Sequence, residues 1–201
     1  MPSDHEIRLL TPADVPRAAA AVARAFHDDP LQVWALPDAA TREPVLTQIF
    51  AVVFEHVDVP LGMSYTDATC STAAVWLPPE RHPVSTAGIA ALRALDAQLA
   101  TIGAGARFHA AQVAMDAVRP PQRHYYLQGL GTDPPCQGRG LASAALAPML
   151  ERCDAERVPA YLESTKEANI VFYERHGFRV MGTIDVPPDG PRLWTMWRDP
   201  G

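Results

Sequence analysis

The sequence predicts a single α/β domain in which short apolar strands alternate with longer amphipathic helices. Strand-like runs recur from residues 6–10 to residues 192–198, and segments with helical spacing of apolar residues separate them. One run, at 124–132, leads into a glycine-punctuated helix start at 137–143. The length of 201 residues suits one core of ordinary size, and the sequence contains no internal repeat or linker. We therefore expect one domain over residues 1–201.

The N-terminal part predicts one strand followed by two helices. Residues 6–10 alternate between polar and apolar side chains, as in a strand with one buried face. The sequence Thr-Pro-Ala-Asp that follows is typical of a helix start, and we expect a helix over about 11–26. A loop over 27–38 then leads into a second helix over about 39–56.

The middle of the chain predicts two strands and a helical insertion. The strands are expected at 63–66 and 72–77, and two helix-like segments follow at about 85–102 and 105–118. Two glycines inside the next strand-like run indicate a β-bulge near 129–131, because glycine weakens strand pairing. The remaining elements are a helix bent at Pro148, a strand at 160–164, a helix capped by Gly177, and a hairpin of strands at 178–186 and 192–198.

The segment 137–143 predicts a binding site for phosphate. Small residues in the first turn of the helix leave the free N–H groups uncovered, and these groups together with the helix dipole favour an anion. The segment lacks the lysine of the Walker pattern. Pro134 stands where a dinucleotide-binding fingerprint needs its third glycine. We therefore expect a phosphorylated ligand of another class.

The sequence Gln-Gly-Arg-Gly-Leu-Ala at 137–142 resembles the phosphate-binding motif of the GCN5-related N-acetyltransferase (GNAT) family. Residues 169–178, with the pattern Asn-x-x-x-Tyr-Glu-x-x-Gly-Phe, resemble a later helix of that family. The order of motifs along nearly the whole chain is similar to that in the puromycin N-acetyltransferase-like members. The resemblance implies a mixed, mostly antiparallel sheet, splayed between two central strands and flanked by helices. It also implies that the helices at 83–120 form an insertion before the CoA-binding strand.

The resemblance implies acetyl-CoA as co-substrate and no metal. In the family, the backbone of the glycine loop holds the pyrophosphate, and the bulged strand pairs with the pantetheine arm. The residues that this assigns to acetyl-CoA are Leu130, Gly131, Thr132, Gln137, Gly138, Arg139, Gly140, Leu141, Ala142, Ser143 and Asn169.

Two residues match catalytic positions of the family. Glu163 corresponds to its usual glutamate, which helps to deprotonate the amine directly or through water. A strand-end carboxylate paired with an arginine is the alternative interpretation of Glu163. Tyr173 corresponds to the residue beside the sulfur, where its hydroxyl can donate a proton to the leaving thiolate. Packing in the core is the alternative interpretation of Tyr173.

The resemblance implies acetyl transfer to a primary amine of a small molecule, with antibiotic-like amines as one candidate class. Asp28, Asp29 and Trp34 are candidates for contact with a cationic acceptor, although the two acids are also typical of a solvated turn and Trp34 of packing. Two alternatives remain open at this point. One is a non-catalytic acyl-CoA-binding regulatory module, and the other is acetylation of a peptide or protein amine.

Charge and composition limit the expected partners. The net charge of −6 and the isoelectric point near 5.6 argue against nucleic acid and anionic membranes as partners. No apolar run of ~18 residues is evident, and no apolar segment of the kind that directs secretion lies near the N-terminus. Three cysteines without metal-ligand spacing are typical of reduced thiols, so we expect a cytoplasmic protein. Both a monomer and a homodimer are compatible with the sequence. Only one of the 17 basic residues is a lysine, which suggests a bacterial source.

Overall fold

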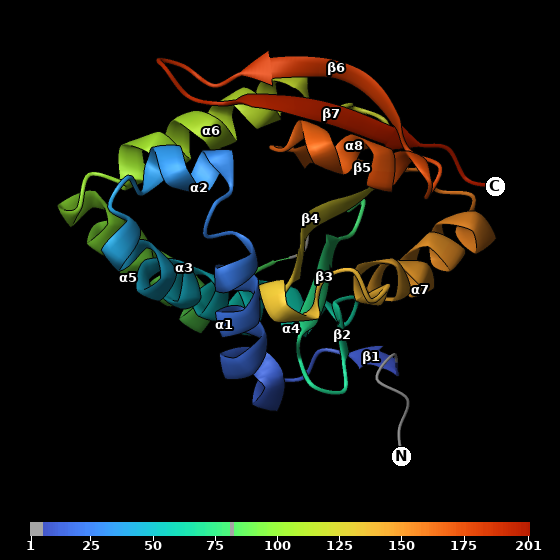
Figure 1. The fold of residues 1–201 in the computed structure, drawn as a ribbon, viewed down its shortest axis with the longest axis horizontal. Coiled ribbons are helices and arrows are strands. Elements are labelled where there is room, and N and C mark those ends of the chain that lie inside the picture. The colour runs from blue at the N-terminus through green and yellow to red at the C-terminus, as the bar shows by residue number, and fades with distance from the viewer. Residues whose placement is uncertain (1–5, 81–82) are drawn as a thin grey trace.

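The computed structural model describes residues 6–80 and 83–201, and a seven-stranded sheet runs through the middle of the molecule (Figure 1). The strand order is β1-β2-β3-β4-β5-β7-β6, and all neighbouring strands are antiparallel except β4 and β5. The predicted mixed, mostly antiparallel sheet is therefore confirmed. The strands are β1 (Ile7–Leu9), β2 (Tyr65–Asp67), β3 (Thr72–Leu77), β4 (Tyr125–Thr132), β5 (Ala160–Ser164), β6 (Arg179–Asp185) and β7 (Arg192–Arg198). Residues 1–5, on which the expectation about secretion partly rests, lie outside the described residues.

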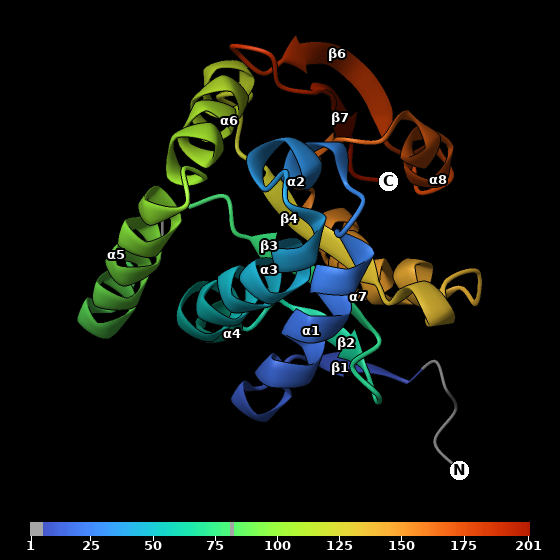
Figure 2. The ribbon, with the colours of Figure 1, turned by 60° about the vertical axis from the view of Figure 1, so that its left-hand side comes forward.

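Helices cover both faces of this sheet. The α-helices are α1 (Val15–Ala25), α2 (Pro30–Ala35), α3 (Ala39–Val53), α4 (Val59–Leu61), α5 (Thr86–Thr101), α6 (Gly105–Val118), α7 (Leu141–Glu156) and α8 (Ile170–Glu174). The short turns are the 3-10 helices η1 (Pro12–Asp14), η3 (Pro134–Cys136) and η4 (Glu167–Asn169), and the π-helix η2 (Phe54–Asp58). The two predicted insertion helices are confirmed as α5 and α6, which extend to one side of the molecule in Figure 2.

The two central strands, β4 and β5, pair over only a short distance. Their register contains Tyr125 opposite Ala160 and Tyr126 opposite Tyr161, and the strands then diverge. Residues 127–132 of β4 consequently have no strand neighbour on the β5 side. Peptide N–H and C=O groups on such an edge can pair with an extended ligand. The predicted splay between the two central strands is thereby confirmed.

A β-bulge in β4 decides which residues face which layer. Val75 of β3 pairs with Gly129, whereas Trp76 pairs with Leu127, so Gln128 is the extra residue. This confirms the predicted bulge, one residue before the expected range. Because one extra residue reverses the alternation of side chains, Gly131 faces α1 after the bulge. A Cβ atom at Gly131 would lie 3.1 Å from the ring of Phe26, so only glycine lets α1 pack this closely.

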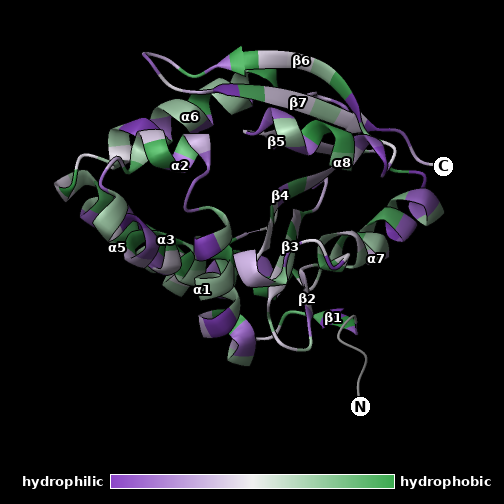
Figure 3. Ribbon diagram, in the orientation of Figure 1, coloured by the Kyte–Doolittle hydropathy of each residue, from purple (hydrophilic) through white to green (hydrophobic). Residues whose placement is uncertain are grey.

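The two faces of the sheet pack against different helices. On β3, Ala74 and Trp76 belong to the core cluster with α7, whereas Ala73 and Val75 belong to the cluster with α1. A strand buried on both faces explains why β3 is apolar at successive positions. Figure 3 shows both hydrophobic and hydrophilic residues on the surrounding helices, as expected for helices with one buried and one exposed face.

Two sequence-based expectations about the N-terminal helices are wrong. The expected loop at 27–38 contains α2, which the side chain of Asp29 caps by accepting a hydrogen bond from the Leu31 N–H. The next helix does not end near 56 but continues through η2 and α4 to Leu61. The whole stretch Ala39–Leu61 has 23 residues and a hydropathy of 1.3, so by length and composition it could cross a membrane. In the fold, α1 and α5 pack against it.

An ion pair between Asp154 of α7 and Arg198 of β7 connects the C-terminal strand β7 to helix α7. The guanidinium donates two hydrogen bonds, of 2.7 and 2.8 Å, and the Gly201 N–H donates a third to the same carboxylate. Arg198 and these bonds lower the pKa of Asp154 to about 2. Because the pKa of Asp154 is lower in the folded protein than in the unfolded chain, where it is ~3.9, the ion pair stabilises the folded state fully above pH ~3.9. This stabilisation is lost as the pH falls through the folded-state pKa of about 2.

The Asp154→Asn variant should therefore be less stable at pH 7, by about 1 kcal/mol after allowance for solvent screening of a side chain that is 35% exposed. The difference from the native protein should shrink between about pH 4 and pH 2. Urea unfolding at several pH values measures both effects. Asp185→Asn is the matched control. Two nitrogens of Arg192 donate hydrogen bonds to the Asp185 carboxylate, as in the Asp154–Arg198 pair, but the Asp185–Arg192 pair is exposed to solvent. A constant difference from pH 7 to pH 2 would contradict the prediction.

Candidate active site

A cavity of about 400 Å³ lies beside the point where β4 and β5 diverge. One wall comes from α1, α2, α3 and η2, a second from α6 of the insertion, and a third from β3, β4, β5 and the start of α8. The cavity brings together Glu163, Asn169 and Tyr173, which the sequence placed in the catalytic and cofactor sites. Leu130 and Asp29 also line it.

Glu163 lies on β5 and faces this cavity. The preceding Leu162 points into the core beside α7, and strand alternation turns Glu163 to the opposite face. Neither carboxylate oxygen makes a hydrogen bond of standard geometry to a described residue, although the hydroxyls of Tyr126 and Tyr161 lie near. Burial raises the pKa of Glu163, and the Tyr126 hydroxyl and the Arg119 charge partly offset that rise. Within residues 6–80 and 83–201, no arginine forms an ion pair with Glu163, and Arg119 pairs with Asp116 instead.

Tyr173 lies on α8, and its side chain reaches the same cavity. The residue is 8% exposed, and its ring packs edge-on against Phe172 and Phe178. Burial raises the pKa of Tyr173, and the negative charge of Asp29 raises it further. The hydroxyl therefore stays protonated and available as a donor at neutral pH. Asn169, one helical turn earlier, is exposed at the mouth of the cavity.

The predicted phosphate loop leaves open space and free N–H groups at the start of α7. Gly138 and Gly140 have φ angles of 75° and 80°, and a Cβ at either position would meet nothing within 4 Å among the described residues. Gly140 is the N-cap and provides no side-chain cap. The N–H groups of Leu141, Ala142 and Ser143 have no acceptor within the helix, because the first intrahelical bond begins at Ala144. The space and the donors fit a phosphate group.

Other residues assigned to the cofactor hold the loop in shape. Gln137 donates a side-chain hydrogen bond of 3.0 Å to the carbonyl of Thr132, which connects the end of β4 to the loop. The hydroxyl of Thr132 bonds that of Thr72 on β3. Gly131 is buried against α1, so its missing side chain serves packing. The side chain of Arg139 is exposed and bonds the Pro135 carbonyl. Direct contact of these four residues with acetyl-CoA remains a prediction.

The three acceptor candidates lie in different environments. Asp29 is buried, caps α2, bonds the Thr165 hydroxyl and lines the cavity. Asp28 is exposed and is not among the cavity-lining residues. Trp34 belongs to the cluster between α2, α6 and the C-terminal hairpin, and Arg107 lies over its ring at 5.9 Å. The structure therefore brings only Asp29 of the three to the cavity.

A family model described as "Acetyltransferase (GNAT) family" matches residues 79–178, which include β4, the phosphate loop, β5 and α8. The chain belongs to this family. A similar curated protein is an uncharacterized N-acetyltransferase from Schizosaccharomyces pombe, 26% identical over 200 residues that cover 93% of this chain and 80% of the relative.

Solved structures share the same fold. One is described as "histone acetyltransferase HPA2 and related acetyltransferase" from Corynebacterium glutamicum, with a TM-score of 0.69, 21% identity, and coverage of 97% of this chain and 96% of the other. A polyamine N-acetyltransferase from Drosophila melanogaster has a TM-score of 0.59 and 16% identity, with coverage of 96% and 99%. At these identities the likeness establishes the fold and not the substrate.

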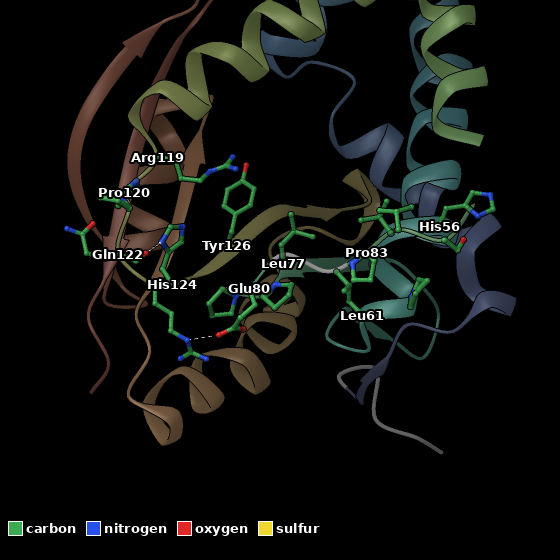
Figure 4. A pocket seen from close by; sticks show the side chains of 18 residues that line it. His56, Leu61, Leu77, Glu80, Pro83, Arg119, Pro120, Gln122, His124 and Tyr126 are labelled. Carbon is green, nitrogen blue, oxygen red and sulfur yellow. Dashed lines mark hydrogen bonds and ion pairs between the residues drawn. The ribbon is translucent and has the colours of Figure 1, made fainter. Parts of the chain in front are cut away.

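A second, larger depression of about 760 Å³ adjoins the cavity of this acetyltransferase. Figure 4 shows Arg119, His124 and Tyr126 on one wall and His56, Leu61 and Pro83 on the other. None of the residues predicted for catalysis or cofactor binding lines it. It shares Leu77, Arg119 and Tyr126 with the smaller cavity, so the two spaces are neighbours.

Sequence reasoning missed several residues of the cavity. Tyr126 and Arg119 lie next to Glu163, with the guanidinium 4.5 Å from the centre of the Tyr126 ring. Tyr126 could have been found, because it precedes the bulge on the face opposite to the buried Tyr125. Asp58 and the phenylalanines of α3 and η2 gave no signal, since their spacing is that of an ordinary apolar helix.

Proposed function

We propose that this GNAT-family protein transfers an acetyl group from acetyl-CoA to a primary amine of a small molecule. One observation carries the proposal. The cavity with Glu163 and Tyr173 lies beside the unpaired part of β4, and the Gln137 side chain joins the end of that strand to the loop that opens α7. A ligand with a phosphate at the helix start can therefore extend along β4 and present its other end to both side chains.

The structure fits the three parts of such a ligand. The free N–H groups at the start of α7 suit the pyrophosphate, and the unpaired edge of β4 suits the amides of the pantetheine arm. The acetyl thioester supplies an electrophilic carbonyl and a thiolate leaving group. Leu130 lines the cavity, and we assign to a backbone N–H near it the hydrogen bond to the carbonyl oxygen as negative charge develops on it.

Glu163 is the proposed base. An alkylamine with a pKa of ~10 is only about a thousandth unprotonated at neutral pH, so removal of its proton is a large part of the barrier. Burial raises the pKa of Glu163 and brings it closer to that of the amine, which makes the carboxylate a better proton acceptor. Its unpartnered oxygens leave room for the ammonium or for one bridging water.

Tyr173 is the proposed donor to the leaving sulfur. Its pKa lies above the ordinary value of 10, whereas a thiol has a value of ~8.5. A full transfer would leave an unfavourable tyrosinate, so Tyr173 acts by hydrogen bonding to the thiolate as it forms. The proton that the amine loses balances the reaction, and the products are an amide and a free thiol.

The size and lining of the cavity support a small acceptor. Phe108, Gln112 and Met115 of α6 close one side of a space of about 400 Å³. Solved relatives are named for polyamine and agmatine acetylation, and the net charge of −6 is compatible with a cationic acceptor. Cytoplasmic location and a monomeric or homodimeric state are further proposals that rest on the sequence alone.

A thiol-release assay with acetyl-CoA and a panel of small amines and lysine peptides tests the function. Release that depends on a small amine supports it. Binding of acetyl-CoA without amine-dependent release would favour a non-catalytic acyl-CoA-binding module. Release with peptides alone would favour a peptide or protein acceptor.

Tyr173→Phe should lower turnover by about 10²-fold and leave acetyl-CoA affinity nearly unchanged, because only the donor to the leaving sulfur is lost. Steady-state kinetics and calorimetry measure the two quantities. Tyr65→Phe is the matched control, since Tyr65 is also partly buried but does not line the cavity. Unchanged turnover in Tyr173→Phe would remove this residue from the mechanism.

A further inference from the structure

Asp58, at the end of the π-helix η2, is a buried acid that the acetyl transfer described above does not use. Its side chain is fully buried at 0% exposure, yet it belongs to the wall of the 400 Å³ cavity. Neither carboxylate oxygen has a hydrogen-bond partner in the ranges 6–80 and 83–201. By contrast, the buried Asp29 bonds the Thr165 hydroxyl and the Leu31 N–H. Asp58 therefore differs from an ordinary structural acid.

An unpartnered acid at this position destabilises the fold. Burial raises the pKa of Asp58 to about 8, and no group in the described part of the chain offsets this rise. Asparagine or an apolar residue would be tolerated better in such surroundings. A buried carboxyl group whose oxygens have no partner in the described part of the chain is free to take one from a bound ligand.

The backbone at Asp58 is also unusual. The helix that begins as α3 widens into a π-turn over Phe54–Asp58 and then resumes as α4. Such turns are rare and occur frequently at functional sites, because they change the direction of the following side chains. The same turn carries Phe54, which lines the cavity together with Asp58.

The surroundings of Asp58 in the cavity suit a cation with an apolar spacer. Phe26, Phe50 and Phe54 form a row with ring centres 5.4 and 5.8 Å apart, and all three line the cavity. Aromatic faces and a carboxylate together attract ammonium and guanidinium groups. Val53 and Val75 add an apolar surface next to them.

Asp58 and Glu163 line the cavity from different walls. The η2 turn contacts β3, whereas Glu163 is on β5, two strands further along the sheet. Two strand spacings correspond to ~10 Å, and the divergence of β4 from β5 beyond Tyr161 makes the span to Glu163 longer. An acceptor that reaches both acids therefore needs its reacting amine at Glu163 and a second group several methylene units away.

We infer that Asp58 is a specificity-determining residue that binds a second cationic group of the acceptor, so that the substrate is a diamine or an amine with a distal guanidinium. This inference rests on the proposed function and adds the acceptor class to it. The row of phenylalanines contacts the alkyl spacer and the distal cation. Glu163 and Tyr173 act on the other amine.

A comparison of linear α,ω-diamines with monoamines of the same chain length tests the inference. The native enzyme should have the higher kcat/KM for a diamine, and Asp58→Asn should reduce the diamine-to-monoamine ratio by about tenfold to a hundredfold, the effect of losing one charge-assisted contact. Asp96→Asn, which removes an exposed acid of α5, should leave the ratio unchanged. An equal ratio in the native enzyme and in Asp58→Asn overturns the inference.

A binding experiment separates this inference from the proposed function. Saturating diamine should raise the unfolding temperature of the native protein more than that of Asp58→Asn, with or without turnover. The variant is nearly isosteric and replaces a carboxyl group that has no hydrogen-bond partner among the described residues, so its own unfolding temperature should not fall. If no amine is acetylated but the diamine shift depends on Asp58, the proposed function fails and the cation site stands. Equal shifts in the two proteins overturn the cation site.

Discussion

The Gly140→Trp variant should bind acetyl-CoA about a hundredfold more weakly than the native protein. Gly140 precedes α7, has a φ angle of 80°, and faces open space. An indole at this position covers the N–H groups of Leu141 and Ala142, to which we assign the pyrophosphate. Loss of two charge-assisted hydrogen bonds, each contributing about 1.5–3 kcal/mol, accounts for an effect of this size or larger.

A second glycine controls for backbone strain. A side chain at φ near +60° to +80° costs about 1–2 kcal/mol wherever it occurs. Gly62 has a φ angle of 63° at the end of α4 and also has nothing within 4 Å of a Cβ position. Gly62→Trp should therefore lose similar stability but bind acetyl-CoA normally. Calorimetric titration of the three proteins measures this. Normal binding by Gly140→Trp would place the phosphate elsewhere.

The sequence was sufficient where local chemistry decides the structure. The strand 125–132, its bulge and the helix start at 141 were all predicted, because glycines and prolines mark these points. The insertion helices were predicted for a similar reason, as Ser85 caps α5 and a glycine precedes α6. The hairpin near the C-terminus follows from the turn residues at 187–191.

Packing between distant segments could not be predicted. The sequence pattern at Gly131 indicates a strand bulge or the approach of a ligand, but in the fold the residue packs against Phe26 at the C-terminal end of α1, 105 positions earlier. The short α2 was missed because six residues do not establish a helical period. Asp58 lies beyond the helix end that the sequence predicts. The spacing of apolar residues does not reveal a π-turn, so the continuation of the helix through Phe54–Asp58 could not be predicted.

The same distinction between local sequence motifs and packing of distant segments applies to the candidate active site. Family resemblance assigned Glu163 and Tyr173, and the structure places both on one cavity. It did not assign Tyr126 or Arg119, because their proximity to Glu163 depends on the pairing of β4 with β5 and on the end of α6. Burial raises the pKa of Glu163, and the residues of α6 that line the same cavity lie far from Glu163 in the sequence, so the strand pattern at 160–164 does not reveal this environment.

Glu163→Gln should lower turnover of an alkylamine by about 10²-fold or more, because it removes the proposed base without a change in volume. The activity of the native enzyme should rise with pH as Glu163 loses its proton. Burial raises the pKa of that group, so the rise should occur at higher pH than for an ordinary glutamate. The glutamine variant should lack this part of the pH profile.

A weakly basic acceptor makes the test specific to proton removal. An amine that is already unprotonated at neutral pH does not need a base for its activation, so Glu163→Gln should slow its acetylation much less than that of an alkylamine. Glu174→Gln, an exposed position on α8, should change neither rate. If Glu163→Gln slowed both acceptors equally, the carboxylate would act in positioning the acceptor or shaping the cavity, and the proton would have to leave through Tyr126 or water.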